Sequence, residues 1–250
     1  LNEMSTLQNV EVLTQWSYPN RYYHAIKWAA EQENVFVVQL NSFGCGPDAI
    51  AVDEVKSLLG KYGKRFIVLR IDEIESLGSV KLRLRSLIDS MRADDGQQTG
   101  CQRVERHKVA IFTENEKQRL IIAPQFAEFC TPPLLRPFRD MGYKVEVLPE
   151  PNRDSVNTGL KYTNNEICYP AIIVIGDLIK ALQSGKYDVN NVAVAITQTG
   201  GACRASSYLS LLKKALIDAG FEHVPIVSLS PGVKGLHEQP GFNLDFKQYM

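Results

Sequence analysis

The chain has neither a surplus of charge nor a long hydrophobic run, and these two absences exclude several classes of protein. Lysine and arginine together number 28, as do aspartate and glutamate, so the formal net charge is zero. A nucleic-acid or acidic-membrane partner would require a basic surplus or a clustered basic face, so neither is expected. The longest apolar run, residues 169–175, contains Pro170 and is far too short to span a bilayer.

Several familiar motifs are also missing. The chain contains no G-x-x-x-x-G-K-[ST] phosphate loop, no G-x-G-x-x-G after a strand, and no G-x-S-x-G nucleophile turn. These absences argue against nucleotide binding and against a Ser/His/Asp hydrolase. No signal peptide opens the chain. Because it starts at Leu1, we expect it to be a segment of a longer protein, with its first lobe incomplete.

Cysteine is scarce, and its count indicates the compartment. The five cysteines are an odd number in a chain without a secretory leader. A disulfide framework is therefore the poorer prediction, and a reducing, cytoplasmic location is the better one.

Short apolar runs alternate with helical patterns, which predicts parallel α/β structure. In the first region, strands are predicted at residues 35–40 and 65–71, the first of them buried. Helices are predicted at residues 18–32, 49–59 and 79–91. A polar segment rich in glycine, glutamine and aspartate follows and predicts a linker at residues 99–107.

The second region repeats the alternation. Strands are predicted at residues 108–112 or 120–123, and at 144–148, 192–197 and 225–229. Helices are predicted at residues 133–141, 169–183 and 206–219, each followed by a glycine of the C-cap type. The predicted fold is therefore α/β, with doubly wound parallel sheets and helices on both faces. It divides into two Rossmann- or flavodoxin-like lobes, residues 1–98 and 108–250.

Three cysteines lie in loops that precede predicted helices. Cys45 follows the first strand, Cys203 follows the strand at residues 192–197, and Cys168 stands at the first turn of the helix at residues 169–183. Open parallel sheets bind ligands at the carboxyl ends of their strands. The unpaired N–H groups and the dipole of a helix N-terminus favour a thiolate or an anionic cofactor.

Glycines flank two of these cysteines and would let the backbone approach a bulky ligand. They are Gly44, Gly46, Gly200 and Gly201. Against a shared site stands the usual role of a lone cysteine, which is most often a small buried hydrophobic residue. The separations of the three cysteines along the chain also match no C-x-x-C spacing. The residues alone therefore leave both interpretations open.

Other candidates are weaker. Cys130 also precedes a helix and could be a fourth ligand, although its apolar setting favours packing, and Cys101 in the linker is a bystander. The four histidines show no i, i+4 pair, so no zinc motif is indicated. The basic run at residues 81–85 is better explained as the solvated face of a helix than as an anion or coenzyme A phosphate contact.

Three cysteine-bearing segments resemble those of a known family, in the same order. They are SFGCGPD at residues 42–48, KYTNNEICYP at 161–170 and QTGGACR at 198–204. The chain resembles the C-terminal part of large activators related to 2-hydroxyacyl-CoA dehydratases, often called CoA-substrate-specific enzyme activases. That part is similar to component subunits of the dehydratases and of benzoyl-CoA reductases. The likeness covers most of the chain, about residues 18–229.

This resemblance implies a cofactor and its ligands. In the dehydratase relatives three cysteines hold an iron–sulfur cluster of the 4Fe–4S type, and related proteins carry a double-cubane cluster. Carried over, Cys45, Cys168 and Cys203 become the metal ligands, and the four flanking glycines become cofactor-binding residues through their backbone amides. An isolated segment can lack the cluster.

The resemblance also implies partners and a function. The chain is expected to be an electron-transfer or reductase module that works with an actin-like ATPase activator domain. It would form part of a 2-hydroxyacyl-CoA dehydratase or ATP-dependent reductase system of anaerobic metabolism. An acyl-CoA is the expected substrate, and a dimer is among the expected assemblies. Two alternatives remain: an interaction or regulatory domain without a cluster, and a zinc or thiol-nucleophile enzyme.

Overall fold

The computed structural model describes residues 16–41, 47–71, 77–92, 108–165, 167–198, 203–229 and 237–243. The chain divides into two compact units, Leu1–Arg106 (unit 1) and His107–Met250 (unit 2). The predicted linker, residues 99–107, lies outside the described residues.

Unit 1 has the strand–helix alternation that its sequence predicts. Its elements are α1 (Ser17–Ala30), β1 (Val37–Asn41), α2 (Pro47–Lys61), β2 (Phe66–Arg70) and α3 (Leu77–Arg92). The two strands pair in parallel, with Val37 opposite Phe66. The core of the unit lies between α1, which contributes Tyr23 and Ile26, and α2, which contributes Val55 and Leu58.

The burial of β1 differs from the prediction of a strand buried throughout. Gln39 and Asn41 are buried, whereas Val38 and Leu40 are 37% and 63% exposed. Alternate residues of a strand share a face, and Val37 packs on the α1–α2 core, so positions 39 and 41 point inward with it.

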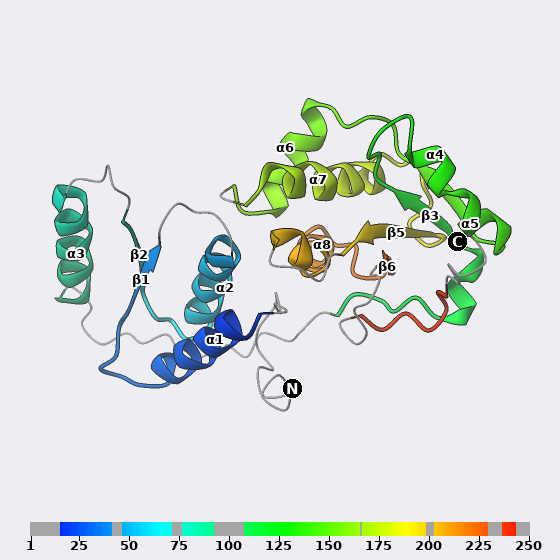
Figure 1. The fold of residues 1–250 in the computed structure, drawn as a ribbon. Coiled ribbons are helices and arrows are strands. Elements are labelled where there is room, and N and C mark those ends of the chain that lie inside the picture. The colour runs from blue at the N-terminus through cyan, green and yellow to red at the C-terminus, as the bar shows by residue number, and fades with distance from the viewer. Residues whose placement is uncertain are drawn as a thin grey trace. The chain divides into compact units, whose positions relative to one another are not determined.

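Unit 2 is a four-stranded parallel sheet with connecting helices (Figure 1). Its strands are β3 (Leu120–Ala123), β4 (Lys144–Val147), β5 (Val192–Thr197) and β6 (Ile226–Leu229), in the order β4-β3-β5-β6. Its α-helices are α4 (Thr131–Leu134), α5 (Arg136–Asp140), α6 (Arg153–Tyr162), α7 (Tyr169–Gln183) and α8 (Tyr208–Asp218). Two 3₁₀ helices, η2 (Glu114–Gln118) and η3 (Arg204–Ser207), complete the unit.

The sheet of unit 2 is covered on both faces. On one face Ile121, Ala193 and Val227 form a core with Phe138 of α5. The alternate residues, such as Val194, are also buried, and they face the side on which α8 packs against β5. The α/β fold with doubly wound parallel sheets is thereby confirmed.

Of the two alternative positions predicted for one strand, residues 120–123 form β3, which confirms the second, and residues 108–112 form no strand. One predicted helix differs from the structure. The helix predicted at residues 133–141 is broken into α4 and α5, and Pro137, which has no N–H to donate, stands in the first turn of α5. Helix α6 was not predicted. None of the helices in the described ranges is both long and apolar enough to cross a bilayer.

The last described segment, residues 237–243, runs beside the start of unit 2 (Figure 1). The amide of Gly241 donates to the carbonyl of Phe112 at 2.9 Å, and the hydroxyl of Tyr143 donates to the carbonyl of Gly241 at 3.1 Å. These bonds join the two segments, and Phe242 packs against the core that contains Phe138.

Candidate functional site

A topological switch point lies in the middle of the four-stranded sheet. Strands β3 and β5 are neighbours, but β3 leads to β4 at one edge and β5 leads to β6 at the other. Such a reversal opens a crevice at the carboxyl ends of the strands, where α/β proteins bind ligands. The segment after β3 ends at Cys130, and the segment after β5 leads from Gln198 to Cys203.

Cys168 occupies the position directly before α7. Its backbone is extended, with φ −60° and ψ 140°, and its carbonyl accepts a bond from the amide of Ala171 at 2.9 Å. Pro170, which has no N–H to lose, stands in the first turn of the helix. The buried neighbour Ile167 anchors the loop. The half-buried thiol of Cys168 therefore sits at a well-formed helix start.

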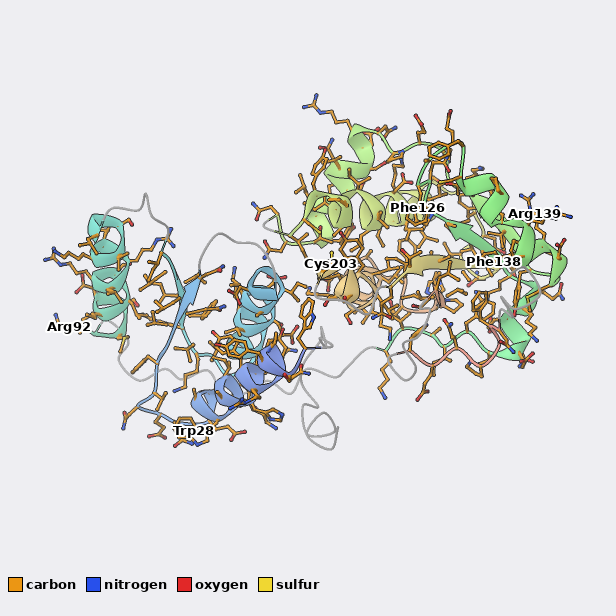
Figure 2. All side chains as sticks on the ribbon, viewed as in Figure 1. Trp28, Arg92, Phe126, Phe138, Arg139 and Cys203 are labelled. Atoms are coloured by element: carbon orange, nitrogen blue, oxygen red, sulfur yellow. The ribbon has the colours of Figure 1, made fainter. Side chains whose placement is uncertain are left out.

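Cys203 occupies the same position before η3. Its backbone is again extended, with φ −76° and ψ 146°, and its carbonyl accepts a bond from the amide of Ser206 at 3.0 Å. Helix η3 runs directly into α8, so Cys203 lies beside the start of α8 (Figure 2). The thiol is free and exposed.

Tyr208 connects these two helix starts. It is the first residue of α8, and its hydroxyl lies 2.8 Å from the sulfur of Cys168. Only the short helix η3 separates Cys203 from Tyr208 in the chain. The contact therefore places the N-terminus of α7 beside the N-terminus of α8, near which Cys203 lies. Tyr208 was not identified from the sequence, where its only signal is its place at the start of the helix that follows a cysteine loop.

A buried polar network holds the end of β5 in place. Gln198, only 3% exposed, donates from Nε2 to the carbonyl of Ser206 in η3 at 2.8 Å. The hydroxyl of Ser228 in β6 donates to Gln198 Oε1 at 3.5 Å, and the amide of Ser228 donates to Gln239 at 2.7 Å. The network fixes the helix that follows Cys203 against two strands. Gln198 begins the QTGGACR segment, but the sequence assigned it no structural role, although a polar residue directly after a mostly apolar strand is a signal.

Several buried polar atoms have no hydrogen-bond partner among the described residues, and those of two side chains lie near the cysteine segments in the sequence. The hydroxyl of Ser207, fully buried, lies next to Tyr208 in the chain. In unit 1 the side-chain amide of Asn41, 2% exposed, ends β1 just before the segment that contains Cys45. Most buried polar groups in proteins are paired, so groups of this kind often mark places where a ligand or water binds.

Cys130 lies in the loop after β3. Its thiol is half-buried and donates to the carbonyl of Ala127 at 3.7 Å. Thr131 closes the same turn, because its hydroxyl accepts from the amides of Phe126 and Ala127 and donates to the carbonyl of Ala127 at 2.8 Å. The neighbouring Phe129 is 86% exposed, so this part of the loop is not an apolar core.

The structure describes only some of the predicted site residues. Cys45 and the four glycines Gly44, Gly46, Gly200 and Gly201 lie outside the described residues, as does Cys101. Within the described ranges, no group of three or more histidine, cysteine, aspartate or glutamate side chains is arranged to hold a metal ion. The predicted three-cysteine site therefore stays a prediction, with two of its members placed.

The clearest perturbed histidine lies on another part of unit 2. Burial is the main cause that lowers the pKa of His237 below its usual value, and its Nε2 lies 2.8 Å from the carbonyl of Ile226. Burial also lowers the pKa of Lys213 in α8. The charge of Lys213 also lowers the pKa of His237, whereas Glu238 raises the pKa of both groups. None of the described cysteines takes part in this cluster.

No protein-family model matches the chain, and comparisons with curated proteins and with solved structures found no significant match to either.

Proposed function

We propose that the chain is an iron–sulfur-binding electron-transfer or reductase module, with Cys45, Cys168 and Cys203 as the ligands. The proposal starts from the three cysteine segments and their resemblance to the dehydratase and activase family. The observation that carries it is the 2.8 Å contact between Cys168 Sγ and Tyr208 Oη, because it links the loop of one thiol to the helix end that bears another. An actin-like ATPase activator domain would supply the electron, and an acyl-CoA is the implied substrate.

The donor chemistry of the chain suits such a group. Thiolates are good ligands for iron, and a cluster held by three of them supplies one-electron transfer and leaves one iron with an exchangeable position. Cys168 and Cys203 are free thiols with solvent access, and each stands directly before a helix. The buried hydroxyl of Ser207, next to Tyr208 in the chain, and the buried amide of Asn41, the last residue of β1, add hydrogen-bonding capacity.

Tyr208 has a defined role in this proposal. With Cys168 as a thiolate, the hydroxyl of Tyr208 donates a hydrogen bond to its sulfur and holds the side chain in one orientation. Hydrogen bonds to ligand sulfurs orient the ligand and tune the potential of an iron–sulfur centre. Gln198 acts one step further away, by fixing η3 to the end of β5.

The experiment is anaerobic reconstitution of the full chain with iron and sulfide, followed by measurement of bound iron and sulfide. We expect the parent protein to bind both, and Cys45→Ala, Cys168→Ala and Cys203→Ala each to lose them. Cys130→Ala is the matched control and should keep its iron. A parent protein that binds no iron, or a control that loses as much as the three ligand variants, would contradict the proposal.

A non-catalytic interaction or regulatory domain is the second candidate. Unit 1 favours it, because Leu40, Leu77 and Leu82 are 63%, 74% and 70% exposed. Large exposed apolar side chains mark a protein-binding surface where they gather in one patch, and this candidate requires that arrangement of unit 1. Partner binding that survives simultaneous Cys→Ala changes at positions 45, 168 and 203 would support this candidate over the first.

A further inference from the structure

One face of the two-stranded sheet in unit 1 is covered over only one of its strands. Val38 lies opposite Ile67 in the parallel pair, and Leu40 lies opposite Leu69, so each pair shares a face of the sheet. Leu69 of β2 is 4% exposed, whereas its partner Leu40 of β1 is 63% exposed. The face that points away from the α1–α2 core is therefore covered along β2 and open along β1.

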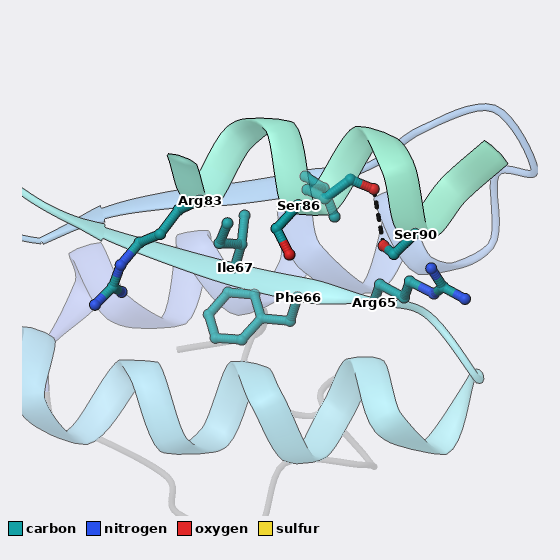
Figure 3. A pocket seen from close by; sticks show the side chains of 7 residues that line it. Arg65, Phe66, Ile67, Arg83, Ser86 and Ser90 are labelled. Atoms are coloured by element: carbon teal, nitrogen blue, oxygen red, sulfur yellow. Dashed lines mark hydrogen bonds between the residues drawn. The ribbon is translucent and has the colours of Figure 1, made fainter. Parts of the chain in front are cut away.

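Helix α3 packs against β2 on this face (Figure 3). In the figure the side chain of Ile67 lies between the strand and the helix, and the ring of Phe66 lies on the other side of the strand. The half-buried apolar residues of α3 recur at helical spacing and form the stripe that faces the sheet. They are Val80, Leu84, Leu87 and Met91.

Arg83 shows which side of α3 lies away from β1. Its Nη1 donates to the carbonyl of Val68 at 3.0 Å. The backbone groups of successive strand residues point to opposite edges, and the amide of Ile71 bonds to the carbonyl of Asn41 in β1. The carbonyl of Val68 therefore lies on the edge of β2 that points away from β1, and the Arg83 side of the helix lies there with it.

The other side of α3 points toward β1 and is apolar beside the stripe. Successive residues of a helix are about 100° apart, which puts Arg83 on one flank of the stripe and Leu77 and Ile88 on the other. Both of these apolar side chains are exposed. Strand register and helical spacing thus place them on the same side as Val38 and Leu40 of β1. These four exposed side chains form the β1–α3 patch.

A row of basic side chains borders the β1–α3 patch. Lys81, Arg85 and Arg92 follow the apolar flank around the helix, and all three are exposed. Asp89 is the one acidic residue in the sequence of α3, and its carboxylate lies 4.0 Å from Arg92. An apolar patch with a basic border is complementary to apolar side chains flanked by carboxylates.

The spacing of the elements suits a helix as the occupant. Packed helices lie about 8–10 Å apart, and paired strands lie about 4.8 Å apart. A helix beside α3 would therefore lie over β1 and over its outer edge, which pairs with no strand in the described part of unit 1. A second copy of the patch would bring two basic borders together, and a flat membrane would meet a step between a helix and a strand.

We propose that the β1–α3 patch binds an acidic amphipathic helix of a partner protein. The helix packs its apolar residues on Leu40 and Ile88 and places its carboxylates beside Lys81 and Arg85. The basic run at residues 81–85 then borders an interface and is not merely a solvated face. The inference deepens the interaction-domain candidate, on which it rests. It requires no metal cluster, so iron binding and this interaction can fail independently.

The test measures binding of synthetic peptides to the full chain by fluorescence anisotropy. The probe is a helical peptide of about 18 residues with leucines at positions i, i+3, i+4 and i+7 and glutamates beside them. The matched peptide has glutamine in place of each glutamate. The glutamate peptide should bind about tenfold more tightly at low salt, and added salt should reduce the difference. Equal affinity of the two peptides, or no binding at about 1 mM peptide, would overturn the proposal.

Matched variants locate the surface. Ile88→Gln and Leu40→Thr should each weaken binding about tenfold, because apolar contact area is lost. Leu82→Gln is the control, since Leu82 is also exposed but lies on the side of α3 opposite the stripe. Arg85→Gln removes no apolar contact and should weaken binding of the glutamate peptide only, which keeps the test decisive if an apolar variant misfolds. Equal effects of Ile88→Gln and Leu82→Gln, or an Arg85→Gln effect on both peptides alike, would contradict the proposal.

Two measurements exclude the other occupants. Analytical ultracentrifugation should show the same oligomeric state for the parent chain and for Leu40→Thr. Vesicles of phosphatidylserine and phosphatidylcholine should show no binding that depends on Ile88. A dimer that dissociates in Leu40→Thr would assign the patch to a second copy of the chain, and vesicle binding that Ile88→Gln abolishes would assign it to a membrane. Either result would overturn the proposal.

Discussion

At the scale of single residues, the contact with Tyr208 distinguishes Cys168 from the other two cysteines that the structure describes, Cys130 and Cys203. The thiol of Cys130 contacts a backbone carbonyl in its own turn, and Cys203 is exposed. The hydroxyl of Tyr208 lies 2.8 Å from the sulfur of Cys168, and in the proposed cluster site a hydrogen bond from it would draw electron density from the sulfur.

We therefore predict that Tyr208→Phe lowers the reduction potential of the reconstituted protein without loss of iron. The variant keeps the ring and removes the hydroxyl, so the sulfur of Cys168 loses one hydrogen bond and donates more charge to the iron. Redox titration followed by visible spectroscopy measures the change. Tyr169→Phe, an exposed neighbour of Cys168, is the control and should leave the potential unchanged. If both variants shift it equally, or if Tyr208→Phe releases the iron, Tyr208 has no tuning role.

Sequence patterns predicted the positions of Cys168 and Cys203 relative to their helices, and the structure places both directly before a helix as expected. The same patterns could not identify Tyr208 or Gln198. Their roles depend on how two helix starts and two strands pack, and Tyr208 is forty positions from the thiol that it contacts. Rules of capping and periodicity describe only residues close together in the chain, so they cannot predict a contact across forty positions.

At the scale of elements, α6 is the helix that the sequence did not reveal. Its buried residues are Ser155, Thr158 and Gly159, which are small and mostly polar, so no apolar stripe marks its inner face. It packs against α7 so closely that a Cβ on Gly176 would meet the backbone of Ser155 and Gly159. A search for helices by apolar periodicity fails when backbone contact replaces apolar packing.

We predict that Gly176→Ala destabilises unit 2 by about 3 kcal/mol, because the added methyl must displace backbone rather than a flexible side chain. Urea unfolding followed by circular dichroism measures the loss. Gly60→Ala in α2 is the control, since a Cβ there meets nothing within 4 Å. In that exposed helical position alanine should be neutral or stabilising by up to about 1 kcal/mol. A loss of stability that is the same in both variants would show that helix propensity, and not the α6–α7 contact, determines the effect.

Helix α3 shows the opposite case. Its apolar spacing predicted a helix at residues 79–91, and the structure has one at Leu77–Arg92. Periodicity also predicts a buried face, yet α3 buries none of its residues. The position of a helix in the sequence therefore followed from local pattern, whereas its degree of burial did not, because burial depends on which surfaces the rest of the chain offers to it.

At the scale of the whole molecule, the strand order of unit 2 decides where a ligand can bind. The alternation of strands and helices predicts parallel pairing, but it does not specify that β3 lies between β4 and β5. That arrangement creates the switch point, and it follows from contacts between residues far apart in the chain, such as Leu120 opposite both Lys144 and Val192.

The last described segment ties unit 2 together and makes its stability sensitive to pH. Residues 237–243 contact β6 through His237 and Gln239, and contact the start of the unit through Gly241. Burial lowers the pKa of His237 in the folded protein, and nearby Lys213 acts in the same direction, whereas the hydrogen bond to Ile226 and the charge of Glu238 oppose it. The folded state therefore binds a proton at His237 less readily than the unfolded chain does.

This difference predicts that the free energy of unfolding falls as the pH drops below about 6.5, the ordinary pKa of histidine. The loss continues until the pH passes the lowered pKa of the folded state, and each unit of pKa depression corresponds to about 1.4 kcal/mol. His237→Gln removes the ionisable ring and keeps a donor for the carbonyl of Ile226. Between about pH 7.5 and about pH 5, the unfolding midpoint of this variant should therefore change less than that of the parent. His223→Gln, at an exposed turn before β6, should retain the parent's pH dependence. If His237→Gln loses stability on acidification as steeply as the parent and the His223→Gln control, the buried imidazole does not control the acid stability of this unit.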